Sequence, residues 1–182
     1  GLFAHFGVEE EIGRCLARKV WLKSGGSIVI DQAEALTAID INTGSYLGKS
    51  NPAETILRTN LEAIPEIVQQ LRLRNIGGII IIDFIDMLDP AHRDQVVATL
   101  ESSLSGDRGR HSVRGMSDLG LVEMTRKRVR ESLGRQLSET CFYCDGRGAL
   151  KSRLAIAFEI FREFAGRAAS TQEPNLVVNV HP

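Results

Sequence analysis

Two aspartates stand at the ends of apolar segments whose pattern predicts strands. Asp40 follows Ala38 and Ile39, and Asp83 follows the run Ile79–Ile82. Functional sites in α/β folds form at the carboxyl ends of strands, where a carboxylate is costly to desolvate unless it is paired or binds a cation. Magnesium suits such a pair, because it prefers oxygen ligands and keeps several waters. With Asn42 on the same strand face as Asp40, the pattern predicts a magnesium site for phosphodiester hydrolysis.

The structural alternative is that these aspartates cap helices or pair with arginines. Two strand-end aspartates with an asparagine alongside favour the metal site over that alternative. Asp86 stays ambiguous, because a supporting acid of the site and a loop acid before a helix cap fit its position equally well.

The segment Gly44–Ser50 is a rival site for a nucleotide. It follows a predicted strand and precedes a predicted helix, as a P-loop does. It is one residue shorter than the P-loop pattern, and Pro52 disfavours helical geometry at the residue before it, so the helix begins too late to face phosphate. A P-loop NTPase therefore stays an alternative, and Lys49 is a candidate contact to RNA phosphate.

Cys141 and Cys144 have the spacing and trailing glycines of a zinc knuckle. Zinc needs four ligands, whereas Cys15 lies in a helical pattern near the N-terminus and the histidines are scattered. The simplest completion is a zinc ion shared with a second copy of the chain across a two-fold axis. A redox pair, and completion by a histidine of the same chain, are the alternatives.

The chain has 182 residues, a net charge of −1 and 43% hydrophobic residues, which allows a packed core and gives no overall preference for a polyanion. Basic residues nevertheless gather between residues 108 and 135. A solvated helix face and a phosphate-contacting surface both fit this cluster. The candidate phosphate contacts there are Arg108, Arg110, Arg126, Lys127 and Arg128. Trp21, Tyr46 and Tyr143 are isolated in the sequence, and we expect them to pack rather than to stack on bases.

Strands that alternate with helices must position these residues, so the predicted core is α/β and ends near Ser138. The N-terminal part reads as a helix from Val8 that runs into a strand-like Val20–Leu22. The other predicted strands are a hairpin of 27–31 with 35–41, a strand buried on both faces at 79–82, one or two strands within 113–124, and a final strand at 176–180. The other predicted helices cover 52–73, 89–104 (capped by Asp89), 126–137 (basic) and 152–168.

No apolar run approaches the ~20 residues that a membrane helix needs, and the N-terminus has no signal-peptide pattern. Three cysteines do not make a secreted disulfide scaffold, so we expect a cytoplasmic protein. Because the chain begins without methionine and enters a helical pattern almost at once, we expect it to be cut from a longer protein.

Several segments taken together resemble the RNase E/G family of bacterial endoribonucleases. They are Arg18–Gly26 (RKVWLKSGG), Ile39–Gly44 (IDINTG), Leu71–Asn75 (LRLRN), Ile81–Met87 (IIDFIDM), Gly120–Arg128 (GLVEMTRKR) and the cysteine segment Cys141–Gly148. The resemblance extends from about Leu2 to Gly148 and fades over the tail.

The resemblance implies a deoxyribonuclease-I-like catalytic subdomain at 16–138, preceded at 1–15 by the end of an RNase H-like segment. A zinc link at 139–150 and part of a small αβ domain at 151–182 follow. Asp40 and Asp83 match the family's Mg²⁺ ligands, and Asn42 its supporting asparagine. Cys141 and Cys144 match the Zn²⁺ ligands that join two protomers, although Phe142 stands where the family usually has proline.

The implied reaction is hydrolysis of single-stranded RNA to 5′-phosphate and 3′-hydroxyl ends, in the processing of rRNA and tRNA and in mRNA decay. The implied assembly is a zinc-linked homodimer, with the small domains joining dimers into a homotetramer. Degradosome partners of the full-length protein and association with the inner membrane surface stay open. The chain lacks the family's N-terminal half, so we expect it to keep the metal site but bind RNA weakly. A non-catalytic RNA-binding and dimerisation module is the alternative.

Overall fold

The computed structural model describes residues 1–44 and 52–170 of the chain. The chain divides into two compact units, Gly1–Ser138 and Glu139–Pro182, and each is described by itself. The strand predicted at 176–180 lies outside the described residues. Within the two described ranges, no helix combines the length and the apolar character needed to cross a membrane.

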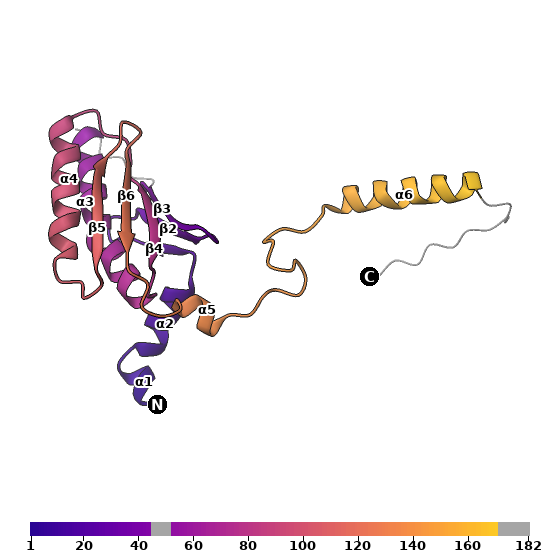
Figure 1. Cartoon of the computed structure of the whole chain (residues 1–182), viewed down its shortest axis with the longest axis horizontal. Coiled ribbons are helices and arrows are strands. Elements are labelled where there is room, and N and C mark those ends of the chain that lie inside the picture. The colour runs from indigo at the N-terminus through magenta and orange to yellow at the C-terminus, as the bar shows by residue number, and fades with distance from the viewer. Residues whose placement is uncertain (45–51, 171–182) are drawn as a thin grey trace. The chain divides into compact units, whose positions relative to one another are not determined.

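A six-stranded sheet with the order β1-β2-β3-β4-β6-β5 forms the centre of the first unit (Figure 1). β3 and β4 run parallel, and the other neighbouring pairs run antiparallel. β2 and β3 form the hairpin that the sequence predicts. The strands are β1 Lys19–Trp21, β2 Ser27–Gln32, β3 Leu36–Asn42, β4 Gly78–Asp83, β5 His111–Met116 and β6 Leu121–Arg126.

Two long helices, α3 (Pro52–Leu73) and α4 (Pro90–Leu104), cover one face of this sheet (Figure 1). Both begin as the sequence predicts. Proline is favourable as a first helical residue, and Asp89 caps α4 by accepting a 2.9 Å hydrogen bond from the Ala91 N–H. The shorter helices of this unit are α1 (Leu2–His5), α2 (Val8–Leu16) and α5 (Leu133–Leu137).

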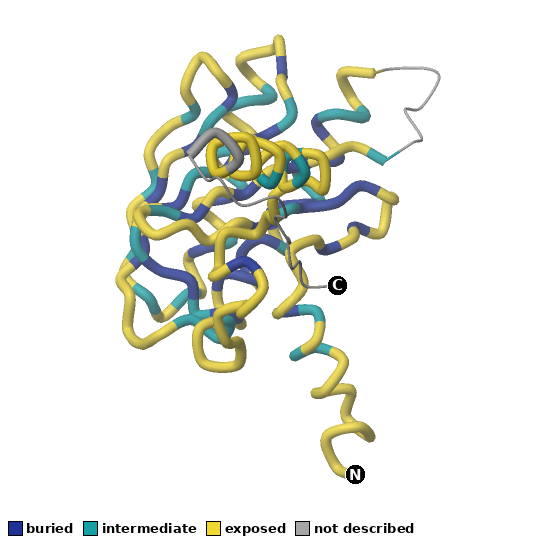
Figure 2. Tube along the Cα trace, turned by 90° about the vertical axis from the view of Figure 1, so that its right-hand side faces the viewer, coloured by how far each residue is buried: buried dark blue, intermediate teal, exposed yellow. Residues whose placement is uncertain are grey.

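The hydrophobic core lies between the sheet and the layer of α3 and α4. Alternate strand residues such as Ile39, Ile41, Ile80 and Ile82 are buried there with the apolar faces of the two helices. Residues between them along the strands are mostly exposed, so the face of the sheet away from α3 and α4 is open to solvent over much of its area. Figure 2 shows buried residues gathered in this unit, while the segment nearest the N-terminus is mostly exposed.

Two predictions for this unit are wrong. Ile79 is 51% exposed, so β4 is buried on the helical face but not on both faces. No helix begins at Arg126, which instead ends β6 opposite Gly78, and the only helix within 126–137 is the short α5. The alternation of Val122, Met124 and Arg126 toward the core is a strand pattern, and it extends two residues further than the sequence interpretation allowed.

The second unit contains the turns around Cys141–Gly148 and the helix α6 (Arg153–Ser170). Positive φ angles at Asp145, Gly146 and Gly148 curl the chain tightly after Cys144. α6 begins one residue after the predicted start at Ser152, and its large apolar side chains, such as Phe158 and Phe161, are exposed.

Candidate active site

Asp40 and Asp83 lie side by side at the ends of β3 and β4. The parallel register pairs Ala38 with Ile81 and Asp40 with Asp83. Both aspartates alternate with core residues along their strands and are exposed, so both carboxylates project from the open face of the sheet. Two residues far apart in the chain are thus brought together at one edge.

Asn42 follows Asp40 by two residues on the same strand face. Its amide Nδ2 donates a 2.7 Å hydrogen bond to Asp40 Oδ2. A hydrogen bond from a neighbouring amide fixes the orientation of a carboxylate that is to bind a metal. The predicted supporting asparagine therefore contacts the carboxylate it was expected to orient.

Negative charge accumulates at this edge of the sheet. Burial raises the pKa of the Asp83 carboxyl, and the charges of Asp40 and Asp86 raise it further. Among the described residues, no lysine, arginine or histidine forms an ion pair with either Asp40 or Asp83. A bound cation would relieve this repulsion.

The donor set suits Mg²⁺ better than a metal held in a full protein cage. In residues 1–44 and 52–170, no three His, Cys, Asp or Glu side chains gather as a metal cage. Mg²⁺ is usually bound by one or two carboxylates and completes its shell with waters and substrate phosphates. Asp40 and Asp83 supply that pair of carboxylates at an edge open to substrate.

Asn60, on α3, supports the site although the sequence interpretation missed it. The residue is fully buried, and its side chain donates to the Ile85 carbonyl at 2.9 Å and accepts from the Ile85 N–H at 3.1 Å. It thereby anchors the segment that carries Asp83 and Asp86 to the helical layer. A signal was available, because Asn60 occupies a core position between Leu57 and Ile64 on the apolar stripe of α3, where a polar residue needs an explanation.

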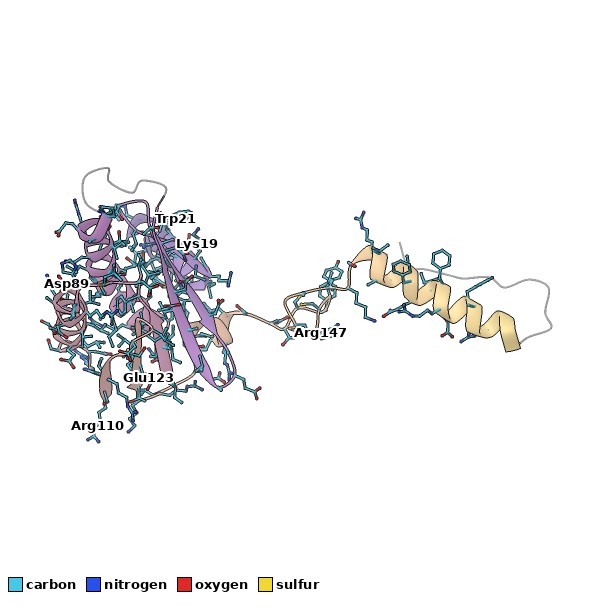
Figure 3. The ribbon with its side chains drawn as sticks, turned by 90° about the horizontal axis from the view of Figure 1, so that it is seen from above. Lys19, Trp21, Asp89, Arg110, Glu123 and Arg147 are labelled. Atoms are coloured by element: carbon cyan, nitrogen blue, oxygen red, sulfur yellow. The ribbon has the colours of Figure 1, made fainter. Side chains whose placement is uncertain are left out.

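The candidate phosphate contacts lie mostly at the other end of the β4–β6 pair. Arg108, Arg110, Lys127 and Arg128 are exposed there. A shallow cavity of about 500 Å³ runs between Ile79, Arg110 and Lys127 on the open face. In Figure 3, Arg110 extends into solvent at one side of the sheet unit. Lys49 lies outside the described residues, as does most of the segment that resembles a P-loop.

Arg126 does not belong with these exposed residues, and its prediction as a phosphate contact is corrected. Its side chain is 7% exposed, and its Nε donates to Asp107 Oδ2 at 2.6 Å. Its Nη1 donates to the Ile76 carbonyl at 2.7 Å and its Nη2 to Asp107 Oδ1 at 3.1 Å. Because the guanidinium is enclosed and bonded on all three nitrogens, it stabilises the fold rather than facing a ligand.

Cys141 and Cys144 lie together in the second unit. The Cys141 thiol is exposed, and hydrogen bonds from the Cys144 backbone, the Tyr143 backbone and the Cys144 side chain lower its pKa. The Gly148 N–H donates to Cys144 Sγ at 3.4 Å. The bonds to Cys141 favour its thiolate, which is the form that binds zinc, and the two cysteines could supply two of the four ligands that a structural zinc site needs.

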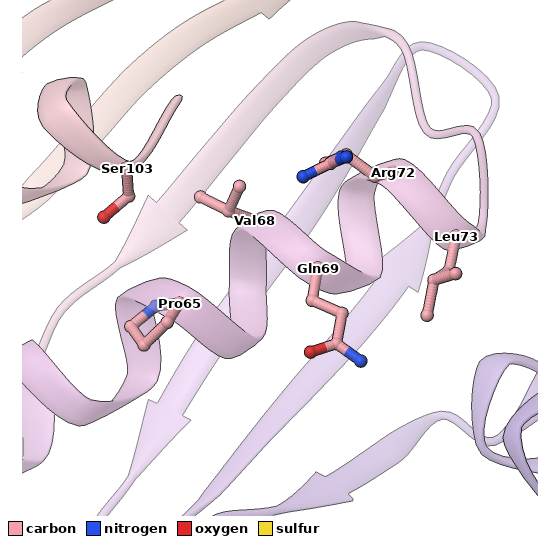
Figure 4. Close-up of a pocket in the computed structure, with 6 residues that line it drawn as sticks. All are labelled: Pro65, Val68, Gln69, Arg72, Leu73 and Ser103. Carbon is pink, nitrogen blue, oxygen red and sulfur yellow. The ribbon is translucent and has the colours of Figure 1, made fainter. Parts of the chain in front are cut away.

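A groove of about 750 Å³ lies between α3 and α4 on the helical face (Figure 4). It is lined by Pro65, Val68, Gln69, Arg72, Leu73 and Ser103. Since it holds no carboxylate, thiol or histidine, it offers no ligands for a metal and no evident acid or base.

Two aromatic residues differ from the packing role expected of them. Trp21 on β1 is 65% exposed, with Lys19 Nζ 4.0 Å from the centre of its ring. Tyr143 is 71% exposed and stacks beside Phe142, with ring centres 4.0 Å apart. Tyr46 lies outside the described residues. Trp21 and Lys19 come from the same short strand and lie next to each other in Figure 3.

Comparison with known proteins gives one consistent result. The family model described as the Ribonuclease E/G family matches residues 1–129. Ribonuclease G of Escherichia coli (strain K12) is 56% identical over 162 residues, which are 89% of this chain and 33% of that protein. Ribonuclease G of Haemophilus influenzae is 51% identical over the same shares, and ribonuclease E of Escherichia coli is 42% identical over 98% of this chain and 17% of that protein. The chain thus spans about a third of the length of the ribonuclease G relatives it matches.

Proposed function

The chain belongs to the ribonuclease E/G family, and from this premise we propose that it is the catalytic part of a Mg²⁺-dependent endoribonuclease. The substrate is single-stranded RNA, cut internally to leave 5′-phosphate and 3′-hydroxyl ends in RNA processing and mRNA decay. The observation that carries the proposal is the register of β3 and β4, which pairs Asp40 with Asp83 on an open face.

In this mechanism Asp40 and Asp83 would hold Mg²⁺ through their carboxylates. When bound, the ion would stabilise negative charge on the scissile phosphate and assist the attack of water on phosphorus. Asn42 fixes the orientation of the Asp40 carboxylate through its 2.7 Å hydrogen bond. Asn60 holds the segment after Asp83 in place, so that Asp83 and Asp86 keep their separation from Asp40.

The proposal extends to the finer architecture. The six-stranded sheet with α3 and α4 is assigned to a deoxyribonuclease-I-like subdomain, followed by a zinc link and the beginning of a small αβ domain. Cys141 and Cys144 of two copies would complete one Zn²⁺ site and join two protomers, with paired dimers forming a tetramer. The adjacent cysteines with a lowered Cys141 pKa support this half-site. A chelator should convert the dimer to monomers, and Cys141→Ser should do so without chelator, as measured by light scattering.

The deciding experiment is cleavage of a labelled single-stranded RNA with and without Mg²⁺. Asp40→Asn and Asp83→Asn should each lower the cleavage rate by about 10³-fold, because half of the protein's metal ligands are lost. Glu123→Gln is the matched control, since it removes an exposed acid from the same face away from the strand ends. The products should carry 5′-phosphates and 3′-hydroxyls.

Other outcomes would replace the proposal. Wild-type cleavage by both aspartate variants would move the chemistry elsewhere. RNA binding without cleavage in any divalent metal would leave the non-catalytic binding and dimerisation module. Nucleotide binding that Lys49→Ala abolishes would favour the P-loop alternative.

A further inference from the structure

Trp21 is an exposed aromatic residue on the same face of the sheet as the paired aspartates. Along β1 the burial alternates, so that Lys19 and Trp21 are exposed while Val20 enters the core. The register pairs Lys19 with Val29 and Val29 with Asp40, so Lys19 lies in the same cross-strand row as Asp40 and Asp83. Opposed residues of paired strands share a face, so Lys19 and Trp21 project to the side of the carboxylates.

Trp21 lies in the same cross-strand row as Asn42. Trp21 pairs with Ser27, and Ser27 pairs with Asn42. Neighbouring strands are about 4.8 Å apart, so the backbone of Trp21 is roughly 10 Å from that of Asn42. An indole with that starting point lies within reach of a nucleotide next to a phosphate that a cation bound by Asp40 and Asp83 would position.

The surroundings of Trp21 suit a nucleotide better than an apolar partner. Its ring is 65% exposed, and the Lys19 ammonium lies 4.0 Å from the ring centre. Within the described residues, Lys19 forms no ion pair with an acid, whereas its neighbour Arg18 is bonded to Asp31. An aromatic ring beside an unneutralised cation is the arrangement that binds single-stranded nucleic acid, because the ring stacks on a base and the cation contacts phosphate.

We infer that Trp21 and Lys19 form a base-stacking subsite, in which the indole stacks on a base of single-stranded RNA near the scissile phosphate and Lys19 binds the adjoining phosphate. This inference rests on the proposed function for the position of the scissile phosphate. It assigns the β1 edge of the sheet to substrate binding and the β3–β4 ends to the metal. Stacking tolerates every base, so this subsite selects for unpaired RNA rather than for a sequence.

Tryptophan fluorescence tests the stacking directly, because Trp21 is the single tryptophan of the 182-residue chain. The chain is titrated with a short single-stranded oligoadenylate in buffer without Mg²⁺ and without chelator, which avoids Mg²⁺-dependent cleavage and leaves the proposed zinc link in place. Binding should quench the Trp21 emission, and the same oligonucleotide annealed to its complement should quench it far less. Trp21→Ala should weaken binding about tenfold and Trp21→Phe by less, since a smaller ring remains.

An abasic ribonucleotide moved stepwise along the RNA locates the stacked base. At one position it should weaken binding to the wild-type chain about tenfold and cause no further loss in Trp21→Ala. In the cleavage assay, Trp21→Ala should raise KM with kcat nearly unchanged. Phe6→Ala is the control, because Phe6 is also an exposed aromatic of this unit but lies outside the sheet.

The outcomes separate this inference from the proposed function. Mg²⁺-dependent cleavage with unchanged Trp21 emission and unchanged binding by Trp21→Ala would overturn the stacking subsite and leave the nuclease intact. Quenching and the abasic effect in a chain that never cleaves RNA would support the subsite while the proposed reaction fails. Self-association lost in Trp21→Ala with RNA binding unchanged would assign the indole to a protein contact and overturn the inference.

Discussion

The two ends of the β4–β6 pair carry charge in opposite ways. At one end Asp83 stands opposite Asp40 without a basic partner among the described residues, and burial, followed by repulsion from Asp40 and Asp86, raises its pKa. At the other end Arg126 is enclosed with Asp107, and the hydrogen bond from Arg126 lowers the pKa of the Asp107 carboxyl. The same sheet thus carries a cluster of aspartates without a counter-charge among the described residues, and an Arg126–Asp107 pair whose charges neutralise each other.

This difference distinguishes the charges that we propose bind a ligand from the charges that stabilise the fold. The Arg126–Asp107 pair satisfies its own hydrogen bonds and joins the end of β6 to the Ile76 carbonyl and to the segment after α4. Within the part of the chain that the structure describes, the aspartate pair accepts one side-chain hydrogen bond, from Asn42 Nδ2 to Asp40 Oδ2. Repulsion among the aspartates destabilises the folded protein, and a bound cation would offset that repulsion. A role in binding a cation would therefore explain why the cluster is present.

The largest expected contrast is in stability. Asp107→Ala should lower the free energy of unfolding by about 3–5 kcal/mol, because it leaves the buried Arg126 guanidinium without its counter-charge. Asp83→Asn should leave stability unchanged or raise it, because it removes repulsion with Asp40. Urea denaturation of both variants measures the difference. Equal losses of unfolding free energy in the two variants would contradict the difference in charge balance between the two ends of the β4–β6 pair.

A smaller effect is expected at Asn60, which serves both the fold and the site. Asn60→Ala should cost about 1–3 kcal/mol, because the buried N–H and carbonyl of Ile85 lose their partner. It should also lower cleavage at limiting Mg²⁺ by about 10–100-fold. Gln70→Ala is the matched control, since Gln70 is another fully buried amide of α3 and bonds to Arg74 far from the strand ends. Similar cleavage by the two variants would reduce Asn60 to a structural residue.

The exposed basic residues near the Arg126–Asp107 pair should affect RNA binding rather than stability. Arg110→Gln and Lys127→Gln should each reduce the salt dependence of RNA binding, lowering the slope of log K against log salt by about 0.7. Arg58→Gln on the helical face should leave the slope unchanged. Binding isotherms at several salt concentrations measure this. Equal slopes for all three variants would remove these residues from the RNA path.

The smallest expected effect is on the free energy of unfolding at acidic pH. Because the folded pKa of Asp107 lies below its ordinary value, the stability it contributes is present above that ordinary value and is lost as pH falls through the lowered pKa. Asp107→Asn should therefore flatten the acid limb of the plot of unfolding free energy against pH. Asp94→Asn, an exposed acid of α4, should leave it unchanged. An unchanged acid limb in Asp107→Asn would show that other carboxyls cause the acid sensitivity.

Much of the fold and the position of the aspartates could be predicted from the sequence. The alternation in β2 and β3, the proline at the start of α3 and the apolar run before Asp83 are local patterns. Strand-end reasoning placed Asp40 and Asp83 at one edge because it needs only the direction of each strand. Asn42 followed from the period of two residues.

The residues that were missed or misread depend on contacts between distant segments. Arg126 lies in a basic run, and only its contact with Asp107 shows that it is buried. Trp21 is apolar, and its exposure follows from the sheet order, which leaves β1 at an edge and its face uncovered. Ile79 belongs to a run of isoleucines that is typical of burial on both faces, yet the described helices α3 and α4 cover only one.

The position of each strand in the sheet also determines how readily that strand unfolds locally. β3 and β4 are flanked on both sides, and their pairing depends on a crossover through the whole of α3. Their amides should exchange with solvent only in the largest opening events, whereas the three-residue edge strand β1 can fray alone. Asp40 and Asp83, the proposed metal ligands, therefore stand on the most protected part of the sheet. Lys19 and Trp21 stand on a strand that can fray alone, so the proposed RNA-stacking subsite can adjust while the separation of the two carboxylates stays fixed.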